Sequence, residues 1–414
     1  MRLALVTGKG PRSAQISLDV LGLAHLFDII ETGQPHGGVK PAAIQRILAA
    51  WDLPPERCAY LGDAVSDMHD AHECGVPALA AAWAAHVDPD LLDAAEPLAR
   101  FNRVEHLSLW LDGRLPDGRW PVVLSHVQAA ALLTLRNSDT APEALRSSYD
   151  LSKTTCAVTL CEDGVQFPVP VDRANSPDMQ GTLATWAALE ELAQEPNWCI
   201  ELTDDPHAPL RPIRAYSAMT GWVRTLYPTI GAPTTLVSGI PMHRIQEVEP
   251  WEDTRRKVRA AAPQGIMLDT ATGLGYSAIQ AAAKAERVIS VEIDPEALRL
   301  ARRNPWSRDL FTASNIEVHI GDIEEVIETF EEHVFARVLH DPPAMSLAGE
   351  LYSTSFYREV RRVLRRNGRL FHYIGDPESA SGRNTTRGVM RRLQDAGFQR
   401  VERRPEAFGV TAQP

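Results

Sequence analysis

The carboxyl-terminal part of the chain alternates short apolar runs with longer amphipathic segments. Within residues 251–414 the apolar runs are GIMLDTA, RVISVEID, NIEVHIG, ARVLHDP and GRLFHYIG. The segments between these runs have the apolar spacing that is typical of helices. Strands in strict alternation with helices predict an α/β domain built on a parallel sheet.

The amino-terminal part, residues 1–105, shows the same alternation. Its apolar runs predict strands at Leu3–Val6, Phe27–Thr32, Cys58–Asp63 and Pro77–Trp83, with a helix over Ala42–Leu53. This pattern predicts a second α/β unit.

Residues 106–250 have a different pattern. LPDGRWPVVLS and TTCAVTLCEDGVQFPVPV alternate like strands around turn residues, and Asp163-Gly164 predicts a hairpin. One amphipathic helix is predicted over Thr182–Gln194, followed by extended chain in RPIRAYSAMTGWVRTLYPT. We therefore expect three domains, 1–105, 106–250 and 251–414, the middle one a small α+β extension.

Composition and charge narrow the class of protein. The 414 residues are 44% hydrophobic and 23% charged, without the run of about 18 apolar residues that a membrane span needs. The five cysteines lack paired C-x-x-C spacing, so we expect no metal site, reduced thiols and a cytoplasmic protein. Residues 1–204 carry a net charge of −14 and residues 205–414 one of +2. The nearly neutral charge of the second half is compatible with RNA, protein or a small molecule as partner. The arginines of Arg358–Arg369 are predicted to lie around a helix, where they form either a solvated face or an RNA-facing patch.

A glycine-containing loop follows the strand GIMLDTA. Gly273 and Gly275 let the backbone turn tightly and approach a ligand. Tyr276-Ser277 replaces the Lys-Ser/Thr of a P-loop, which disfavours ATP, and Ala278 is tolerated in the dinucleotide fingerprint. Glu292, at the end of the next strand, can accept hydrogen bonds from ribose hydroxyls of either NAD or S-adenosylmethionine.

Two further strand ends favour the second of these ligands. Asp322 follows the third strand, where a carboxylate can accept the adenine amino hydrogen. Asp341, Pro342 and Pro343 follow the fourth strand, directly over the reactive end of such a ligand. His340, just before them, is more typical of a strand-end side chain but is also a candidate general base.

These residues together resemble those of class I S-adenosylmethionine-dependent methyltransferases. From about residue 120 onward the chain resembles, more narrowly, predicted archaeal-type methyltransferases of undetermined substrate, through GWVRTLYPT, LVSGIPMHRI, PWEDT, LDTATGLGYSAI, NPWSR, HDPPAMSLAGELYS and LFHYIGDP. The resemblance implies a Rossmann-like domain that binds S-adenosylmethionine through Asp269, Ala271, Gly273, Gly275, Tyr276, Glu292, Asp322 and Asp341, with Asp341, Pro342, Pro343 and His340 at the reacting centre. An aminopropyl transferase that uses decarboxylated S-adenosylmethionine, or a noncatalytic S-adenosylmethionine sensor, remains open on the same fold.

One departure from the amino-methylating pattern concerns the acceptor. Such enzymes place an aromatic residue after Asn/Asp-Pro-Pro, whereas Ala344 stands here. Stacking on a flat base would have to come from Tyr352, Phe356 or Trp306.

The amino-terminal part carries a second group of polar residues at predicted strand ends. Thr7, Lys40, Asp63 and Asp67 supply a hydroxyl, an ammonium and two carboxylates, which can hold a phosphate and a magnesium ion. Their order resembles the haloacid dehalogenase superfamily, specifically the carboxyl-terminal part of phosphoglycolate-phosphatase-like enzymes. The resemblance implies a phosphatase or a phosphate-binding module.

The nucleophile of that family is missing from this segment. It is the first Asp of a D-x-D motif on an earlier strand, and Met1–Val6 contains no aspartate. Without it no phospho-aspartate forms, so we expect a partial domain without phosphatase activity, a truncation or fusion remnant. The missing strand would lie between those that carry Thr7 and Asp63. Either these strands close up, or another chain fills the gap, or the domain is loosely folded.

Overall fold

The computed structural model describes most of the chain as two compact units. The described residues are 2–33, 40–84, 87–101, 104, 107, 111, 121–136, 145–168, 181–203, 205–343, 349–376 and 378–414. The first unit comprises Met1–Ser108 with Arg114–Arg119, and the second comprises Leu109–Gly113 with Trp120–Pro414. Each unit is described by itself.

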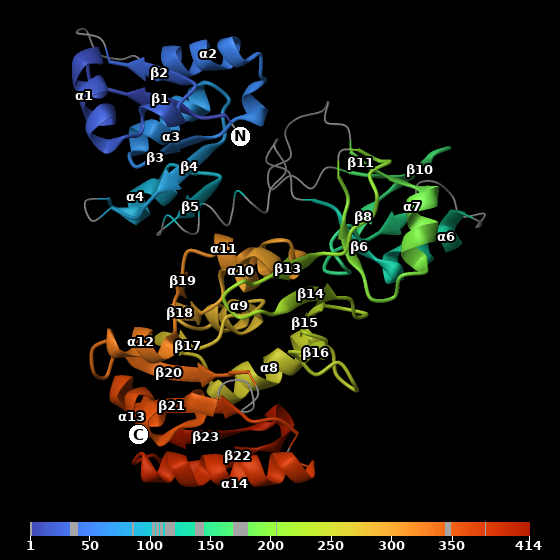
Figure 1. Ribbon diagram of the computed structural model, residues 1–414, viewed down its shortest axis with the longest axis vertical. Coiled ribbons are helices and arrows are strands. Elements are labelled where there is room, and N and C mark those ends of the chain that lie inside the picture. The colour runs from blue at the N-terminus through green and yellow to red at the C-terminus, as the bar shows by residue number, and fades with distance from the viewer. Residues whose placement is uncertain are drawn as a thin grey trace. The chain divides into compact units, whose positions relative to one another are not determined.

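The first unit is an α/β structure with two small parallel sheets (Figure 1). The sheets consist of β1 (Ala4–Thr7) with β2 (Ile29–Thr32), and of β3 (Tyr60–Gly62), β4 (Ala78–Ala81) and β5 (Ala99–Phe101). The helices are α1 (Pro11–Leu21), α2 (Lys40–Trp51), α3 (Val65–Glu73) and α4 (Pro89–Ala94). The four predicted strands and the predicted helix are confirmed.

Strands β1 and β3 belong to separate sheets, and within the described residues they do not pair with each other. The first of the three alternatives for the missing strand, closure of the gap, is therefore wrong. Apolar side chains of this unit are exposed: Leu61 of β3 is 41% exposed, and Val20 of α1 is 81% exposed. The other two alternatives stay predictions.

In the second unit, the described residues between 121 and 250 form antiparallel sheets and two helices. The strands are β6 (Val123–Ser125), β7 (Arg146–Ser147), β8 (Cys156–Ala157), β9 (Thr159–Leu160), β10 (Gly164–Phe167), β11 (Thr182–Thr185), β12 (Cys199–Glu201), β13 (Arg214–Tyr216), β14 (Val223–Tyr227), β15 (Thr234–Val237) and β16 (Ile240–Pro241). The helices are α6 (His126–Arg136) and α7 (Trp186–Ala193). Strands β13 to β16 make a four-stranded antiparallel sheet in chain order.

The helix predicted over Thr182–Gln194 is wrong at its start. Residues 182–185 pair with β10 as strand β11, and α7 begins at Trp186. The helix begins at Trp186 partly because the preceding residues pair with β10. It also begins there because the Thr185 hydroxyl accepts a hydrogen bond from Ala188 N at 3.2 Å and caps the helix. The hairpin predicted at Asp163-Gly164 is confirmed by the pairing of β9 with β10.

Residues 251–414 form a seven-stranded sheet in the order β19-β18-β17-β20-β21-β23-β22 (Figure 1). Its strands are β17 (Ile266–Asp269), β18 (Arg287–Glu292), β19 (Ile316–Ile320), β20 (Phe335–His340), β21 (Leu364–Tyr373), β22 (Gln399–Arg404) and β23 (Gly409–Gln413). The helices are α8 (Pro250–Ala261), α9 (Tyr276–Ala282), α10 (Pro295–Arg302), α11 (Arg308–Thr312), α12 (Ile323–Glu328), α13 (Thr354–Val363) and α14 (Ala380–Asp395). Strands β17 to β21 are parallel and β23 is antiparallel to its neighbours, so all five predicted strands are confirmed.

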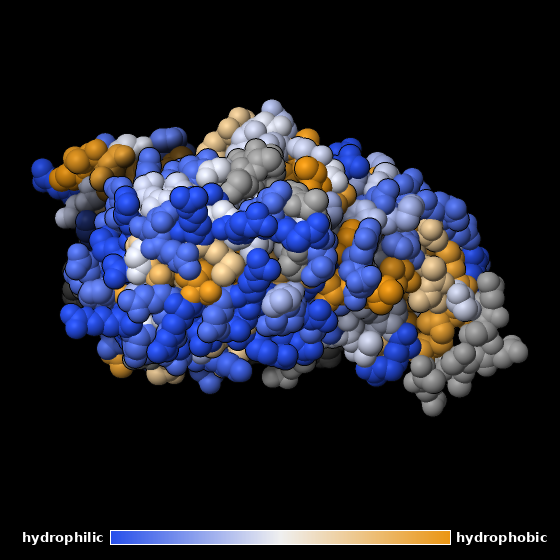
Figure 2. Space-filling view, turned by 90° about the horizontal axis from the view of Figure 1, so that it is seen from below, coloured by the Kyte–Doolittle hydropathy of each residue, from blue (hydrophilic) through white to orange (hydrophobic). Residues whose placement is uncertain are grey.

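The arginines of Arg358–Arg369 do not share one helix. Helix α13 ends at Val363 and β21 begins at Leu364, so Arg365, Arg366 and Arg369 lie on the strand. On the side of this unit where α14 lies, the surface is mainly hydrophilic (Figure 2). In the described part of the chain, no helix has the length and apolar character that a membrane crossing needs.

Candidate functional site

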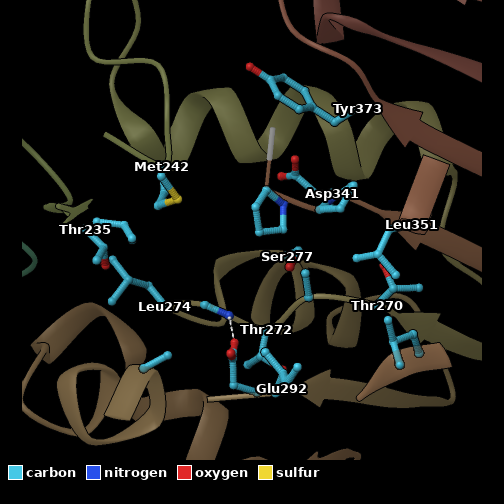
Figure 3. A pocket seen from close by; sticks show the side chains of 18 of the residues that line it. Thr235, Met242, Thr270, Thr272, Leu274, Ser277, Glu292, Asp341, Leu351 and Tyr373 are labelled. Atoms are coloured by element: carbon cyan, nitrogen blue, oxygen red, sulfur yellow. Dashed lines mark hydrogen bonds between the residues drawn. The ribbon is translucent and has the colours of Figure 1, made fainter. Parts of the chain in front are cut away.

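A cavity of about 580 Å³ lies at the carboxyl ends of β17, β18 and β20. The strand order reverses between β17 and β20, which is where ligands bind in open parallel sheets. In Figure 3, Glu292 and Asp341 enter the cavity from opposite sides. The extension before residue 250 completes the lining with Thr220, Trp222, Arg224, Thr235, Val237, Ile240, Pro241, Met242, His243 and Arg244. The division of this unit at residue 250 stays a prediction.

The two glycines of the loop have different environments. Gly273 has φ +53°, lines the cavity, and has open space among the described residues where a Cβ would lie. Gly275 has φ +76° and is not among the lining residues, and a Cβ there would lie 2.6 Å from Leu310 Cδ2. Gly273 thus leaves room for a ligand, whereas Gly275 permits close packing of α11 against the loop.

Glu292 holds this loop through its carboxylate. Its Oε2 accepts from Gly273 N at 2.8 Å, and its Oε1 accepts from Asp294 N at 3.0 Å. Burial raises the pKa of Glu292, and these two N–H donors oppose the rise. The side chain is 7% exposed and lines the cavity, so both oxygens retain lone pairs for a ligand. Its contact with a ribose stays a prediction.

Asp269 lies beneath the loop, is fully buried and does not line the cavity. Its Oδ2 accepts from Ser277 Oγ at 2.8 Å and from Ser290 Oγ at 2.9 Å. In the described part of the chain Oδ1 has no hydrogen-bond partner, and burial raises the pKa of Asp269 to about 7. Asp269 therefore orients Ser277, which does line the cavity.

The remaining residues expected to bind the cofactor line the cavity. Asp322 caps α12, with Oδ1 accepting from Glu324 N at 2.9 Å. Tyr276 is anchored through its hydroxyl, which donates to Pro233 O at 2.9 Å and accepts from Asn304 Nδ2 at 2.8 Å. Ala271 also faces the cavity.

Asp341, Pro342 and Pro343 line the same cavity. Asp341 Oδ2 lies 2.7 Å from Lys257 Nζ, and Tyr352 donates through its hydroxyl to Pro343 O at 3.1 Å. Tyr352 also lines the cavity. The other two stacking candidates do not: Phe356 packs on His340 and Trp306 packs on Trp251. Ala344 lies outside the described residues.

The role of His340 as a general base has no support in the geometry. Its side chain is fully buried and does not line the cavity. Nδ1 is 2.7 Å from Thr270 Oγ1 and Nε2 is 3.0 Å from Leu351 O, so both nitrogens are already engaged. Burial lowers its pKa to about 4, which keeps the ring neutral. His340 joins β20 to the segment before α13.

Sequence reasoning did not identify Lys257, which is 1% exposed beneath Asp341. Asp253 and Lys257 occupy buried positions of α8, along with Pro250, Thr254, Val258 and Ala261. A lysine and an aspartate four residues apart on the apolar face of a helix are a signal in PWEDTRRKV that could have been recognised.

Arg224 of the extension also escaped sequence reasoning. Arg224 Nε lies 2.8 Å from Asp294 Oδ2, which ties β14 to the segment after β18. The ring of His243 lies 5.3 Å from that of Tyr276, and burial lowers the pKa of His243 to about 3. These contacts place the extension over the opening of the cavity.

In the first unit the structure brings together two of the four phosphate-site candidates. Lys40 Nζ lies 2.5 Å from Asp67 Oδ1. Asp67 also accepts from Tyr60 and from the N–H of Ala64. Thr7 Oγ1 accepts from Lys9 N at 3.2 Å, and Asp63 is exposed. No group of three or more metal-ligating side chains is present within the described residues.

Family models match both parts of the chain. Residues 1–81 match a haloacid dehalogenase-like hydrolase, and residues 263–389 match a methyltransferase domain. The carboxyl-terminal segment is thus similar in sequence to methyltransferase domains. Both resemblances drawn from the motifs are thereby confirmed, as is the α/β fold of each segment.

Three curated relatives match parts of the chain. An uncharacterized protein of Methanocaldococcus jannaschii is 47% identical over 190 residues, which are 45% of this chain and 65% of that protein. A human tRNA (uracil-5-)-methyltransferase homolog A is 32% identical over 105 residues, 24% of this chain and 16% of the relative. Polyamine aminopropyltransferase 2 of Hyperthermus butylicus is 33% identical over 87 residues, 20% of this chain and 28% of the relative. The chain thus spans less than two thirds of the length of each relative.

Proposed function

We propose that the second unit transfers a methyl group from S-adenosylmethionine to an acceptor that presents itself at Asp341. The observation that carries this proposal is the convergence of Gly273, Glu292, Asp322 and Asp341 on one cavity at the carboxyl ends of the parallel strands. The first unit is proposed to be catalytically inactive.

The residues present suit an adenosyl sulfonium ligand. The open space beside Gly273 leaves room for a ribose within hydrogen-bonding reach of the Glu292 carboxylate, which lines the cavity. Asp322 Oδ2 has no hydrogen-bond partner among the described residues, so it can accept the amino hydrogen of adenine. When bound, S-adenosylmethionine supplies an activated methyl group with a neutral thioether as leaving group.

The protein's own contribution is positioning. Asp341 and the carbonyl of Pro343, which Tyr352 holds, lie at one side of the cavity and orient the acceptor. Holding two reactants in line converts a bimolecular step into an effectively unimolecular one. Lining residues from the extension restrict the access of water.

A second candidate is aminopropyl transfer on the same fold. The two cationic residues that line the cavity within the described chain, Arg224 and Arg244, are each paired with a buried aspartate. The carboxylate of the methionine part of S-adenosylmethionine would therefore find only neutral donors among these residues. Decarboxylated S-adenosylmethionine lacks this carboxylate and needs no cationic partner for it. The pairing of both arginines and the short match to an aminopropyltransferase support aminopropyl transfer as the second candidate function.

Isothermal titration of the whole protein with S-adenosylmethionine and with its decarboxylated form separates the two functions. We expect tighter binding of S-adenosylmethionine and at least 10-fold weaker binding in Asp322→Ala, but not in the exposed control Asp395→Ala. Absence of binding by the wild type ends the proposal, and preference for the decarboxylated form selects aminopropyl transfer.

The acceptor is tested with methyl-labelled cofactor. The protein is incubated with RNA, protein and metabolite fractions, and the labelled fraction defines the substrate class. Cofactor binding without transfer to any fraction would favour a noncatalytic sensor.

A further inference from the structure

A chain of alternating charges leads from the protein interior to the cavity. Lys257 Nζ lies 2.7 Å from Asp341 Oδ2, 3.2 Å from Asp253 Oδ2 and 3.9 Å from the centre of the Tyr373 ring. Asp253 is also paired with Arg244, whose guanidinium lies 3.8 Å from the centre of the Phe408 ring. Of the two carboxylates that Lys257 contacts, only Asp341 lines the cavity.

This arrangement distinguishes the two carboxylates. Asp253 is 0% exposed and has two cationic partners, so it is neutralised without Lys257. The Asp341 side chain is 22% exposed, and Lys257 is its single cationic partner among the described residues. Removal of an ion-pair partner from a buried carboxylate favours its protonated form.

The two oxygens of Asp341 have different surroundings. Oδ2 accepts from Lys257, whereas Oδ1 has no hydrogen-bond partner in the described part of the chain. The carboxylate is therefore held at one oxygen and open at the other. An ionised carboxylate accepts hydrogen bonds and cannot donate one.

We propose that Lys257 is a positioning residue that keeps Asp341 ionised and fixes Oδ2, so that Oδ1 accepts a hydrogen bond from the methyl acceptor. The inference rests on the proposed function for the identity of the reaction. It implies an acceptor atom that carries a proton, an amine, amide or hydroxyl. The acceptor lone pair forms the new bond to carbon as the carbon–sulfur bond breaks, and the acceptor's proton passes to water.

The ionisation of Asp341 can be tested without knowledge of the acceptor. The melting temperature is measured between about pH 5 and pH 8.5 for the wild type, Lys257→Met, Asp341→Asn and the double variant. The exposed Lys284→Met is the matched control. The other titratable or charged groups facing the pair, unchanged in all variants, are Asp253, His243, Arg244, Asp269, Tyr352 and Tyr373.

The sign of the expected change follows from the direction of the shift. Burial raises the pKa of Asp341, and Lys257 opposes that rise. In Lys257→Met the folded-state pKa of Asp341 rises further above its unfolded value, so stability is present at low pH and is lost as pH rises. We expect Lys257→Met to lose several degrees more than the wild type across this range, and Asp341→Asn in the same background to remove most of that extra loss.

Two results would overturn the inference. One is an equal loss of melting temperature at every pH in Lys257→Met, which indicates a packing role alone. The other is a double variant with the same pH dependence as Lys257→Met. If Lys257→Met does not fold near neutral pH, the double variant is the deciding protein. Removal of the unpaired Asp341 charge should restore its folding, so a double variant that is also unfolded contradicts the inference.

The functional arm uses the same proteins. We expect Lys257→Met/Asp341→Asn to transfer label at least 10-fold more slowly than the wild type at saturating cofactor, because a neutral amide oxygen accepts a hydrogen bond more weakly than a carboxylate and Lys257 no longer fixes it. Transfer at the wild-type rate contradicts the inference. Failure of the wild type to bind cofactor ends the proposed function and leaves the pH result on Asp341 standing, so the two failures are distinguishable.

Discussion

The backbone N–H of Gly273 donates to Glu292 Oε2 at 2.8 Å, which joins the loop after β17 to the end of β18. The residues are 19 positions apart in the chain and meet because their strands are parallel neighbours. The carboxylate that shapes the loop is also the one expected to contact the ligand. Loop geometry and ligand affinity are therefore coupled at this contact.

Substitution Glu292→Gln tests that coupling. The amide can accept through its oxygen alone, so one of the two backbone donors, Gly273 N or Asp294 N, loses its acceptor. We expect cofactor binding by calorimetry to weaken about 10-fold or more, which is roughly 1.4 kcal/mol. The exposed Glu286→Gln should bind as the wild type does, and unchanged affinity in Glu292→Gln would show that the loop holds without this contact.

The two glycines should respond differently to alanine. In Gly275→Ala the Cβ meets Leu310 and the backbone has a positive φ, so we expect a loss of about 2–4 kcal/mol in the free energy of unfolding. In Gly273→Ala only the backbone cost of about 1 kcal/mol applies, but the methyl group enters the cavity and should weaken cofactor binding. Denaturant unfolding and calorimetry measure the two effects, and equal destabilisation by both changes would contradict this assignment.

Asp269 predicts a pH dependence of stability. Its folded-state pKa is raised by burial to about 7, above the unfolded value of about 3.9. Its stabilising contribution is therefore present at low pH and is lost as pH rises through about 7. Asp269→Asn cannot ionise, and the hydroxyls of Ser277 and Ser290 can still donate to its amide oxygen. We expect the melting temperature to fall less between pH 5 and pH 8 in this variant, and an identical slope would show that Asp269 does not titrate there.

The first unit should not hydrolyse phosphate esters. Its Asp67 carboxylate, which was expected to help hold a magnesium ion, is already engaged by Lys40, Tyr60 and the N–H of Ala64. We expect no turnover of p-nitrophenyl phosphate with magnesium above the buffer rate. Turnover that Asp63→Asn abolishes would contradict this prediction and show an active site in the first unit.

Local pattern was sufficient for most of the architecture. The strands that end at Glu292 or just before Gly273, Asp322 and Asp341 are predictable, because the apolar run that marks each strand lies within a single element. The carboxyl ends of parallel strands meet at one edge, so residues just after those strands could be expected to share a cavity. The helix start at Trp186 was not predictable in this way, because Thr182–Thr185 becomes a strand through pairing with β10.

The amino-acid sequence alone therefore determined the fold of both units and the strand ends that surround the cavity. Three-dimensional packing decided which neighbouring side chain reaches it. His340 and Asp341 are adjacent in the chain, yet one is sealed between Thr270 and Leu351 while the other opens to the cavity. Lys257 meets Asp341 across 84 residues. Such contacts depend on how α8 packs beside β20 and β21, and a pattern within a single element carries no information about that packing.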